Sequence, residues 1–277
     1  MKKAVKTIVP TRFHSKLRYL QELFDPKTSG DRAKAKKLVA DNHCLTCVIA
    51  ETTHGTYCVP ESSMQRPAAR MALEGVRHEK QTLDYISKHS SGGDIIMAGT
   101  YFGDFLPTAS KACSEGFLVW GFEPNPENFR CATLTKKLND LKNVNLQNLA
   151  LGNEKDTLHL ITTDVLGRAL GGASRVVEAG YKPVLKQTLS KVDIARIDDL
   201  VPTDRPISLI QLDVEGHEVA VLQGAMGTIE RSKPTLILED KMGDRKLMEH
   251  DWLKENLLPL GYTNQGHLNG NLVLEAI

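Results

Sequence analysis

The sequence lacks any run of apolar residues close to the roughly 20 that cross a bilayer. Its first residues, MKKAVKTIVPTRFH, also lack a sustained apolar stretch, so we expect neither a secretory signal nor a membrane partner. Five cysteines, an odd number, favour reduced thiols and a cytoplasmic location. Aromatic residues make up only 5% of the chain and are scarce near its basic residues. Because nucleic-acid binding commonly combines basic and aromatic side chains, we expect no nucleic-acid partner.

A large net charge is also lacking, because 35 Lys and Arg face 34 Asp and Glu. The charge is nevertheless uneven. Residues 1–37 hold eleven basic and three acidic residues, which gives +8 there and −7 in the remaining chain. A basic arm can attract phosphate, but a solvated helix and tail explains the same charge and is the interpretation we prefer. Residues 15–40 are predicted to be helical, with a break at DPKTSG.

A cluster of thiol and imidazole residues lies in the segment CLTCVIAETTHGTYCVP, which is predicted to form a β-hairpin. Cys44, Cys47, His54 and Cys58 are residue types that bind zinc. Strand residues alternate between faces, however, so Cys44 and Cys47 are expected on opposite faces of one strand. Packing as small apolar side chains is the preferred interpretation, and we expect no metal here.

Apolar strands alternate with helices from residue 93 onward, which indicates βαβ units and a mostly parallel sheet. The C-terminal sequence GYTNQGHLNGNLVLEAI predicts two adjacent strands joined by a tight Asn-Gly turn. The predicted fold is therefore α/β and Rossmann-like, of the class I methyltransferase type, with a seven-stranded mostly parallel sheet and an antiparallel C-terminal hairpin. Residues 1–90 form an N-terminal helical and hairpin extension, and residues 91–277 form the main domain. The predicted strands cover 94–99, 117–123, 143–151, 207–213 and 235–240, with an accessory strand at 157–162, and the predicted helices cover 67–89, 126–140, 217–232 and about 244–258.

The first strand of this pattern ends in a turn with only two glycines, Gly99 and Gly103. Such a turn lets a ligand approach the backbone and the start of the next helix. The missing third glycine disfavours a dinucleotide. Glu123 ends the next strand, 20 positions after Gly103, where a carboxylate can accept hydrogen bonds from both ribose hydroxyls. A nucleoside ligand without pyrophosphate, such as S-adenosylmethionine, fits these features better.

The motifs AGTYFGDF, FEPNPENF, NLALGN and QLDVEGHEVAVLQGA resemble those of FkbM-type S-adenosylmethionine-dependent methyltransferases over about residues 92–277. The resemblance implies methyl transfer and a cofactor that lies over the glycine turn, with the ribose diol on Glu123. Members commonly carry an acid two residues before the first turn glycine, but this chain has Met97 there. Asp104, Asp213 and Glu79 are the candidates to replace it. The implied cofactor-binding residues are Gly99, Thr100, Tyr101, Gly103, Asp104, Glu123, Pro124, Asn125, Asn128, Asn148, Leu149, Ala150 and Asp213.

Candidate catalytic residues follow the strand ISLIQLD, at whose carboxyl end Asp213 is expected to point into the crevice. Asp213 or His217 can act as general base toward a hydroxyl acceptor, and Glu215 lies between them. The following Glu218 is equally well explained as a favourable charge at a helix N-terminus. Carboxylates of Asp213 and Glu239 or Asp240 can alternatively hold a divalent cation, which we do not favour.

Substrate contacts are predicted from Ser174 and Arg175 in the glycine-rich loop 167–175, and from Glu239. The preferred function is O-methylation of a small-molecule or sugar hydroxyl, with residues 1–90 as the cover over the acceptor. The alternatives are N-methylation of a small-molecule amine, an NAD-dependent oxidoreductase, and a non-catalytic nucleoside-binding protein. The sequence leaves the acceptor's identity and a homo-oligomeric state open.

Overall fold

The computed structural model describes residues 45–178, 180–240 and 247–277. The chain divides at Leu45 into two units, and the larger, Thr46–Ile277, holds all but one of the described residues. The predicted helix over 15–40, the basic arm and Cys44 lie outside the described residues. None of the described helices is both long enough and apolar enough to cross a membrane.

The predicted hairpin is confirmed as two antiparallel strands, β1 (Cys47–Glu51) and β2 (Thr56–Pro60). Strand β2 is buried and packs against helix α6 (Pro126–Leu138), where the N–H of Cys58 donates to the Thr135 hydroxyl at 2.9 Å. A short turn of 3₁₀ helix, η1 (Glu61–Ser63), follows. The hairpin is thus an integral part of the larger unit.

The helix predicted over 67–89 is two helices, α3 (Pro67–Leu73) and α4 (Lys80–His89). Gly75, at φ +75°, follows the end of α3 in the left-handed conformation that stops a helix. Glu79, directly before α4, is also left-handed, at φ 46° and ψ 51°. The break matters for function, because it places Glu79 at the edge of the cavity described below.

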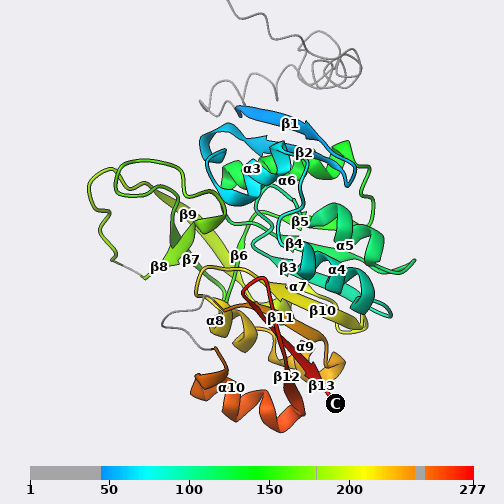
Figure 1. Ribbon diagram of the computed structural model, residues 1–277. Coiled ribbons are helices and arrows are strands. Elements are labelled where there is room, and N and C mark those ends of the chain that lie inside the picture. The colour runs from blue at the N-terminus through cyan, green and yellow to red at the C-terminus, as the bar shows by residue number, and fades with distance from the viewer. Residues whose placement is uncertain (1–44, 179, 241–246) are drawn as a thin grey trace, which may run out of the picture. The chain divides into compact units, whose positions relative to one another are not determined.

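The central sheet has seven strands, as predicted, in the order β12-β13-β11-β10-β3-β4-β5 (Figure 1). All neighbouring pairs are parallel except those of β13, which runs antiparallel to β11 and β12. Residues Asn269 and Gly270 form the tight turn between the last two strands, both at positive φ. The strands are β3 (Asp94–Ala98), β4 (Val119–Phe122), β5 (Val144–Gln147), β10 (Ile207–Leu212), β11 (Thr235–Glu239), β12 (Tyr262–Leu268) and β13 (Asn271–Ala276).

Helices cover both faces of this sheet because its strands are apolar on both sides (Figure 1). Alternate strand residues such as Ile95 and Leu209 pack with α4, α5 (Leu106–Ala112) and α6. Their neighbours Ile96 and Ile210 pack on the opposite face, with α7 (Ile197–Leu200), α8 (Glu218–Gln223), α9 (Met226–Ser232) and α10 (Asp251–Asn256). Residues two apart along a strand therefore point to the same layer.

Two more predicted elements are interrupted. The helix predicted over 217–232 is split into α8 and α9 around Gly224, whose ideal Cβ position lies 1.9 Å from the carbonyl oxygen of Gly152. The helix predicted over about 244–258 is α10 between two 3₁₀ turns, η3 (Leu247–Glu249) and η4 (Leu258–Leu260), with 244–246 outside the described residues. A close backbone contact and local turns thus limit helix length.

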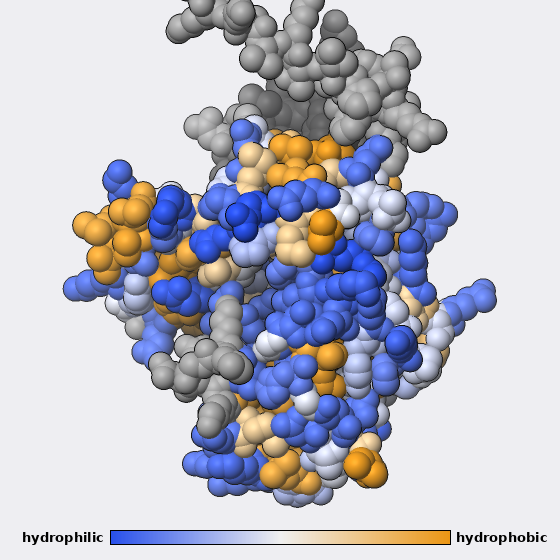
Figure 2. Space-filling view, in the orientation of Figure 1, coloured by the Kyte–Doolittle hydropathy of each residue, from blue (hydrophilic) through white to orange (hydrophobic). Residues whose placement is uncertain are grey.

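The accessory strand predicted over 157–162 is confirmed as β7 (Asp156–Ile161), but the second sheet to which it belongs was not predicted. The four strands of this sheet lie in the order β6-β9-β7-β8, and the other three are β6 (Ala150–Leu151), β8 (Arg175–Val177) and β9 (Leu189–Ala195). The strand predicted over 143–151 is divided between the two sheets, as β5 and β6. The loops of the second sheet expose Val165, Leu166, Val184 and Leu185, and Figure 2 shows apolar side chains gathered on that side of the molecule.

Candidate functional site

Two neighbouring cavities lie at the carboxyl ends of the central strands, the usual ligand position in a parallel sheet. The larger has a volume of about 350 Å³ and lies over β3, β10 and β11. The smaller, of about 30 Å³, lies toward β4 and the second sheet. The carboxylates that line the larger cavity are those of Glu79, Asp104, Asp213, Glu215 and Glu239.

Gly99 and Asp213 line both cavities and stand between them. Gly99 has a φ of +82°, and its ideal Cβ position lies only 1.8 Å from the carbonyl oxygen of Asp213. The N–H of Asp213 in turn donates to the carbonyl of Ala98 at 3.0 Å. A side chain at residue 99 would therefore push the ends of β3 and β10 apart.

Glu123 directly follows β4. The residue is 3% exposed, and its carboxylate accepts from three donors. The N–H of Tyr101 donates to one oxygen at 2.8 Å, and the N–H of Asn125 donates to the other at 2.9 Å. The Asn128 amide donates to that second oxygen at 3.3 Å. Burial raises the pKa of Glu123 to about 7 although these hydrogen bonds lower it. Its partners are neutral, so the carboxylate is not engaged in an ion pair with another described residue.

Two asparagines near Glu123, Asn125 and Asn148, form hydrogen bonds with backbone groups. Asn125 caps α6, accepting from the N–H groups of Glu127 and Asn128 at 3.0 and 3.5 Å. The Asn148 amide donates to the carbonyls of Glu123 and Pro124, at 2.7 and 3.1 Å. These contacts fix the turn after β4 and so orient the Glu123 carboxylate.

The segment 171–174 contributes Gly172 and Ser174 to the lining of the smaller cavity. The Asn128 amide donates to the carbonyl of Gly171 at 3.1 Å, and the Asn125 amide donates to the Ser174 hydroxyl at 3.0 Å. Gly171, at φ +58°, has an ideal Cβ position 2.7 Å from the Tyr101 hydroxyl oxygen. The segment thus rests on the same side chains that surround Glu123, which keeps the space beside Glu123 small.

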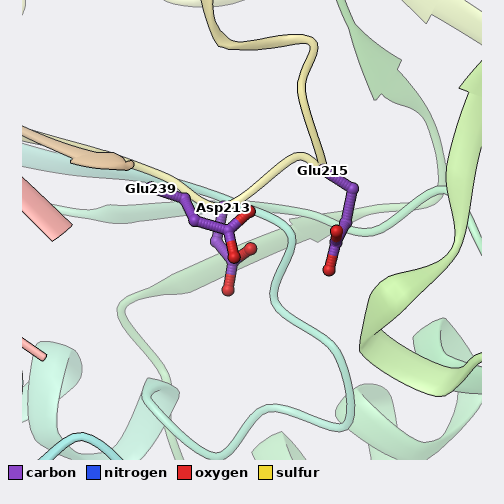
Figure 3. Close-up of side chains that lie close together, drawn as sticks. All are labelled: Asp213, Glu215 and Glu239. Atoms are coloured by element: carbon purple, nitrogen blue, oxygen red, sulfur yellow. The ribbon is translucent and has the colours of Figure 1, made fainter. Parts of the chain in front are cut away.

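A cluster of three carboxylates lines the larger cavity beside the junction. The carboxylate oxygens of Asp213, Glu215 and Glu239 lie within 4.8 Å of one another, and Figure 3 shows them on neighbouring strand ends and turns. Glu215 has a positive φ of 56° in the turn after β10. Burial, followed by the charges of Glu239 and Glu215, raises the pKa of Asp213 well above its usual range. This carboxyl therefore holds a proton more readily than an exposed aspartate does.

The other two polar residues of this turn face away from the three carboxylates. Glu218 is buried, and its carboxylate accepts from the N–H groups of Val214 and Gly216 at 3.3 and 3.1 Å. His217 lines the smaller cavity, and burial lowers its pKa. Its Nε2 is buried without a hydrogen-bond partner among the described residues. Glu218 therefore stabilises the turn, while His217 lies on the Glu123 side of the junction.

The structure separates the predicted site residues into four groups. Thr100, Tyr101, Asp104, Asp213, Glu215 and Glu239 line the larger cavity, and Glu123, Pro124, Leu149, Ala150, Ser174, Asp213 and His217 line the smaller one. Asn125, Asn128 and Asn148 support them through hydrogen bonds. Gly103 belongs to the turn, where its φ is +84°, and Arg175 is exposed on β8; neither lines a described cavity.

Several lining residues were not predicted as site residues. Gln211, Asn271 and Arg66 line the larger cavity, and Glu79 was named only as a candidate for replacing an acid. An isolated amide within the apolar strand ISLIQL is a signal that sequence reasoning could have used for Gln211. Arg66 and Asn271 come from distant parts of the chain, and no local pattern marks them.

A family model described as the methyltransferase FkbM domain matches residues 98–262. No curated protein matches the chain significantly.

Solved methyltransferases resemble the chain only distantly. Methyltransferase FkbM from Methylobacillus flagellatus is 15% identical, with a TM-score of 0.46, over 66% of this chain and 43% of that chain. A SAM-dependent methyltransferase from Aquifex aeolicus is 14% identical, with a TM-score of 0.41, over 77% of this chain and 95% of that chain. The tRNA (uracil-54, C5)-methyltransferase of Pyrococcus abyssi, in complex with S-adenosyl-L-homocysteine, is 12% identical, with a TM-score of 0.41, over 83% and 43%. The chain thus spans under half of the length of two of these proteins.

Proposed function

The chain belongs to the FkbM methyltransferase family, and from this premise we propose that it transfers a methyl group from S-adenosylmethionine to a hydroxyl of a small-molecule or sugar acceptor. The observation that carries the proposal is the position of Asp213, which lines both cavities at their junction. A ligand that occupies both cavities must pass this residue. The acceptor then occupies the part of the larger cavity that lies beyond Asp213, away from the smaller cavity.

The residues present fit the cofactor. Gly99 lines both cavities and lets the ends of β3 and β10 approach closely. Glu123 offers a carboxylate already oriented by Tyr101 and Asn125. Several buried polar atoms lack hydrogen-bond partners in the described part of the chain. One is His217 Nε2, on a residue that lines the smaller cavity, and another is Asn128 Oδ1, on the residue whose amide donates to Glu123. When bound, S-adenosylmethionine supplies an electrophilic methyl group on a sulfonium. Glu123 would hold the ribose hydroxyls, and Pro124, Leu149 and Ala150, which line the smaller cavity, would contact the adenine.

The work left to the chain is to align the acceptor, exclude water and remove a proton from the hydroxyl. Asp213 is the proposed base because, among the described carboxylates, it alone lines both cavities, and because its carboxyl has a raised pKa. Glu215 and Glu239 maintain that raised pKa through their negative charges. His217 lies on the cofactor side and is the weaker candidate for this step.

N-methylation of an amine is the second candidate. The carboxylates around the larger cavity, Glu239 and Glu215 among them, favour an acceptor that arrives as an ammonium ion. Such an acceptor must lose its proton before it can attack, whereas a hydroxyl loses its proton during transfer. Parallel assays of alcohols and amines of similar size separate the two.

The experiment that tests the proposal is incubation of the purified protein with candidate metabolite pools and S-adenosylmethionine carrying a labelled methyl group. Mass spectrometry should detect label on an oxygen of one small molecule. Thermal unfolding with S-adenosylhomocysteine and with NAD should show stabilisation by the first alone. Stabilisation by NAD alone would instead favour an oxidoreductase. Binding of S-adenosylhomocysteine without any labelled product would favour a non-catalytic binding protein.

A further inference from the structure

We infer that Glu79, together with the Gln211 amide, holds the α-ammonium group of S-adenosylmethionine, in place of an acid at Met97. This inference rests on the proposed function. It concerns the amino-acid end of the cofactor, which is a zwitterion and loses hydration when it enters a cavity. A buried ammonium requires an anionic or carbonyl partner.

Gln211 supplies the first observation. It lies on β10, is 5% exposed, and is paired in register with Met97 on one side and Ile237 on the other. Gln211 and Met97 both line the larger cavity. The Gln211 side chain makes no hydrogen bond with any residue in the described ranges. Because Gln211 lines the cavity between two apolar strand neighbours, its amide can form a hydrogen bond with a polar group of a ligand there.

Glu79 supplies the second observation. Its carboxylate Oε2 accepts from the Asn271 amide at 2.6 Å and from the Thr82 hydroxyl at 3.2 Å. Asn269 tightens the same corner, since its Oδ1 accepts from the N–H groups of Gln81 and Thr82 at 3.0 and 3.3 Å. The break between α3 and α4 and the turn between β12 and β13 therefore position one carboxylate at the cavity wall.

Glu79 is a better partner than Asp104, the other acid on this side. Burial raises the pKa of Asp104 to about 6, and the Glu79 charge adds to that increase. The charge of Glu79 also contributes to the raised pKa of Asp213, so the Glu79 carboxylate acts on two other acids that line the cavity. An ammonium beside Glu79 reduces the repulsion among all three. Asp213 itself stands at the junction, next to the acceptor.

The test compares three ligands by titration calorimetry. S-adenosylhomocysteine carries the ammonium and the carboxylate, its decarboxylated analogue carries the amine alone, and 5′-methylthioadenosine carries neither. Glu79→Gln keeps an oxygen for the Asn271 amide but removes the charge. We expect it to weaken binding of the first two ligands roughly tenfold and to leave the third unchanged. Gln211→Met should weaken the same two ligands by a smaller factor.

Asp104→Asn is the matched control, because it removes an equal charge from the same cavity, and thermal unfolding checks that each variant is folded. A larger loss from Asp104→Asn than from Glu79→Gln would overturn the assignment. So would an equal effect of Glu79→Gln on all three ligands, or no effect on any. If the wild-type protein binds none of the three, the cofactor itself is wrong and the proposed function falls with it. Binding of all three by the wild type separates a failed assignment from a failed function.

Discussion

The ideal Cβ position of Gly99 lies 1.8 Å from the carbonyl oxygen of Asp213, closer than any real Cβ contact. Because the φ of Gly99 is +82° as well, Gly99→Ala combines a steric clash with an unfavourable backbone conformation. We expect this variant to lose more than about 2 kcal/mol of unfolding free energy and most of its affinity for S-adenosylhomocysteine. Chemical denaturation and calorimetry measure the two effects.

Gly92→Ala is the control for the backbone conformation alone. Gly92 has a similar φ of +86°, and nothing lies within 4 Å of its ideal Cβ position. The unfolding free energy of Gly92→Ala should fall by about 1 kcal/mol, and its affinity for S-adenosylhomocysteine should equal that of the wild type. Equal behaviour of the two variants would contradict the importance of the contact with Asp213.

Ligand binding should release a proton from Glu123 below pH 7. Burial raises the pKa of this carboxyl to about 7, and hydroxyl donors of a ribose bind best to its ionised form. Affinity for S-adenosylhomocysteine should therefore fall by up to about tenfold per pH unit between pH 7 and pH 5. Over the same range the binding heat should vary with the ionisation enthalpy of the buffer.

Glu123→Gln should bind weakly and show little pH dependence from pH 5 to 7. An unchanged pH dependence in this variant would assign the proton to another group. Because the pKa of Glu123 is raised in the folded protein, its contribution to stability decreases as pH rises from about 4.5 to 7. The unfolding free energy of the wild type should reflect that sign.

The segment 171–174 should slow cofactor entry. The space beside Glu123 is about 30 Å³, and ligand pockets typically measure about 300 Å³ or more, so this segment must move. Ser174→Ala removes the contact with the Asn125 amide and the hydrogen bond that the Ser174 hydroxyl donates to the Gly171 carbonyl at 2.7 Å. We expect association of S-adenosylhomocysteine to become about three- to tenfold faster in stopped-flow measurements.

Ser62→Ala is the corresponding control. The Ser62 hydroxyl donates to the Glu127 carboxylate at an exposed position of α6, the helix that Asn125 caps. It should leave association unchanged. An association rate for Ser174→Ala equal to that of the wild type would show that these two contacts do not limit entry.

A substitution near the start of β3, the end far from Gly99, should change stability without changing ligand binding. Asp94 is fully buried and accepts from the Arg205 guanidinium at 2.5 and 2.6 Å and from the Trp120 indole at 2.7 Å. Burial alone raises its pKa, but these partners and the N–H of Leu118 hold the pKa below its usual value. The stabilisation is therefore present above about pH 4 and is lost as pH falls below it.

Arg205→Ala should lower the unfolding free energy by about 2–3 kcal/mol at pH 7. This loss is somewhat smaller than that expected from breaking a fully buried ion pair, because Arg205 is partly exposed. Ligand affinity of the folded variant should stay at the wild-type level, since Asp94 is at the strand end opposite Gly99. Lys254→Ala, in an exposed pair with Asp251, should change stability by less than about 0.5 kcal/mol. A loss of ligand affinity in Arg205→Ala would contradict this separation.

The central sheet could be predicted because apolar strands alternate with helices, and the Asn269-Gly270 turn marks the final hairpin. The second sheet could not, because β6 and β8 are short and β9 is largely exposed on one face. Helix breaks at Gly75 and Gly224 depend on a single left-handed residue and on a contact with Gly152. Periodicity alone does not reveal either.

The candidate site was partly predictable for a related reason. Residues at strand ends, such as Glu123 and Asp213, are placed by the topology, and the structure brings them to adjoining cavities. Ser174 and Arg175 are adjacent in sequence but differ in position. Ser174 directly follows the 3₁₀ turn Gly171–Ala173 and accepts from the Asn125 amide, whereas Arg175 begins β8 and is exposed. Glu79 reaches the cavity through its contact with Asn271, which is 192 residues away. Such contacts arise only from the complete fold.

Turnover should depend on Asp213 more than cofactor affinity does. Asp213→Asn keeps the size of the side chain but cannot accept the hydroxyl proton. We expect kcat to fall by at least about 100-fold, while the affinity for S-adenosylhomocysteine changes by less than about threefold. Glu218→Gln is the matched control in the same turn, since Glu218 binds the N–H groups of Val214 and Gly216 and lines neither described cavity. It should reduce thermal stability with little effect on kcat. Equal kcat in Asp213→Asn and the wild type would remove Asp213 from the proton-transfer step, and the base would then have to be sought among the other carboxylates of the larger cavity.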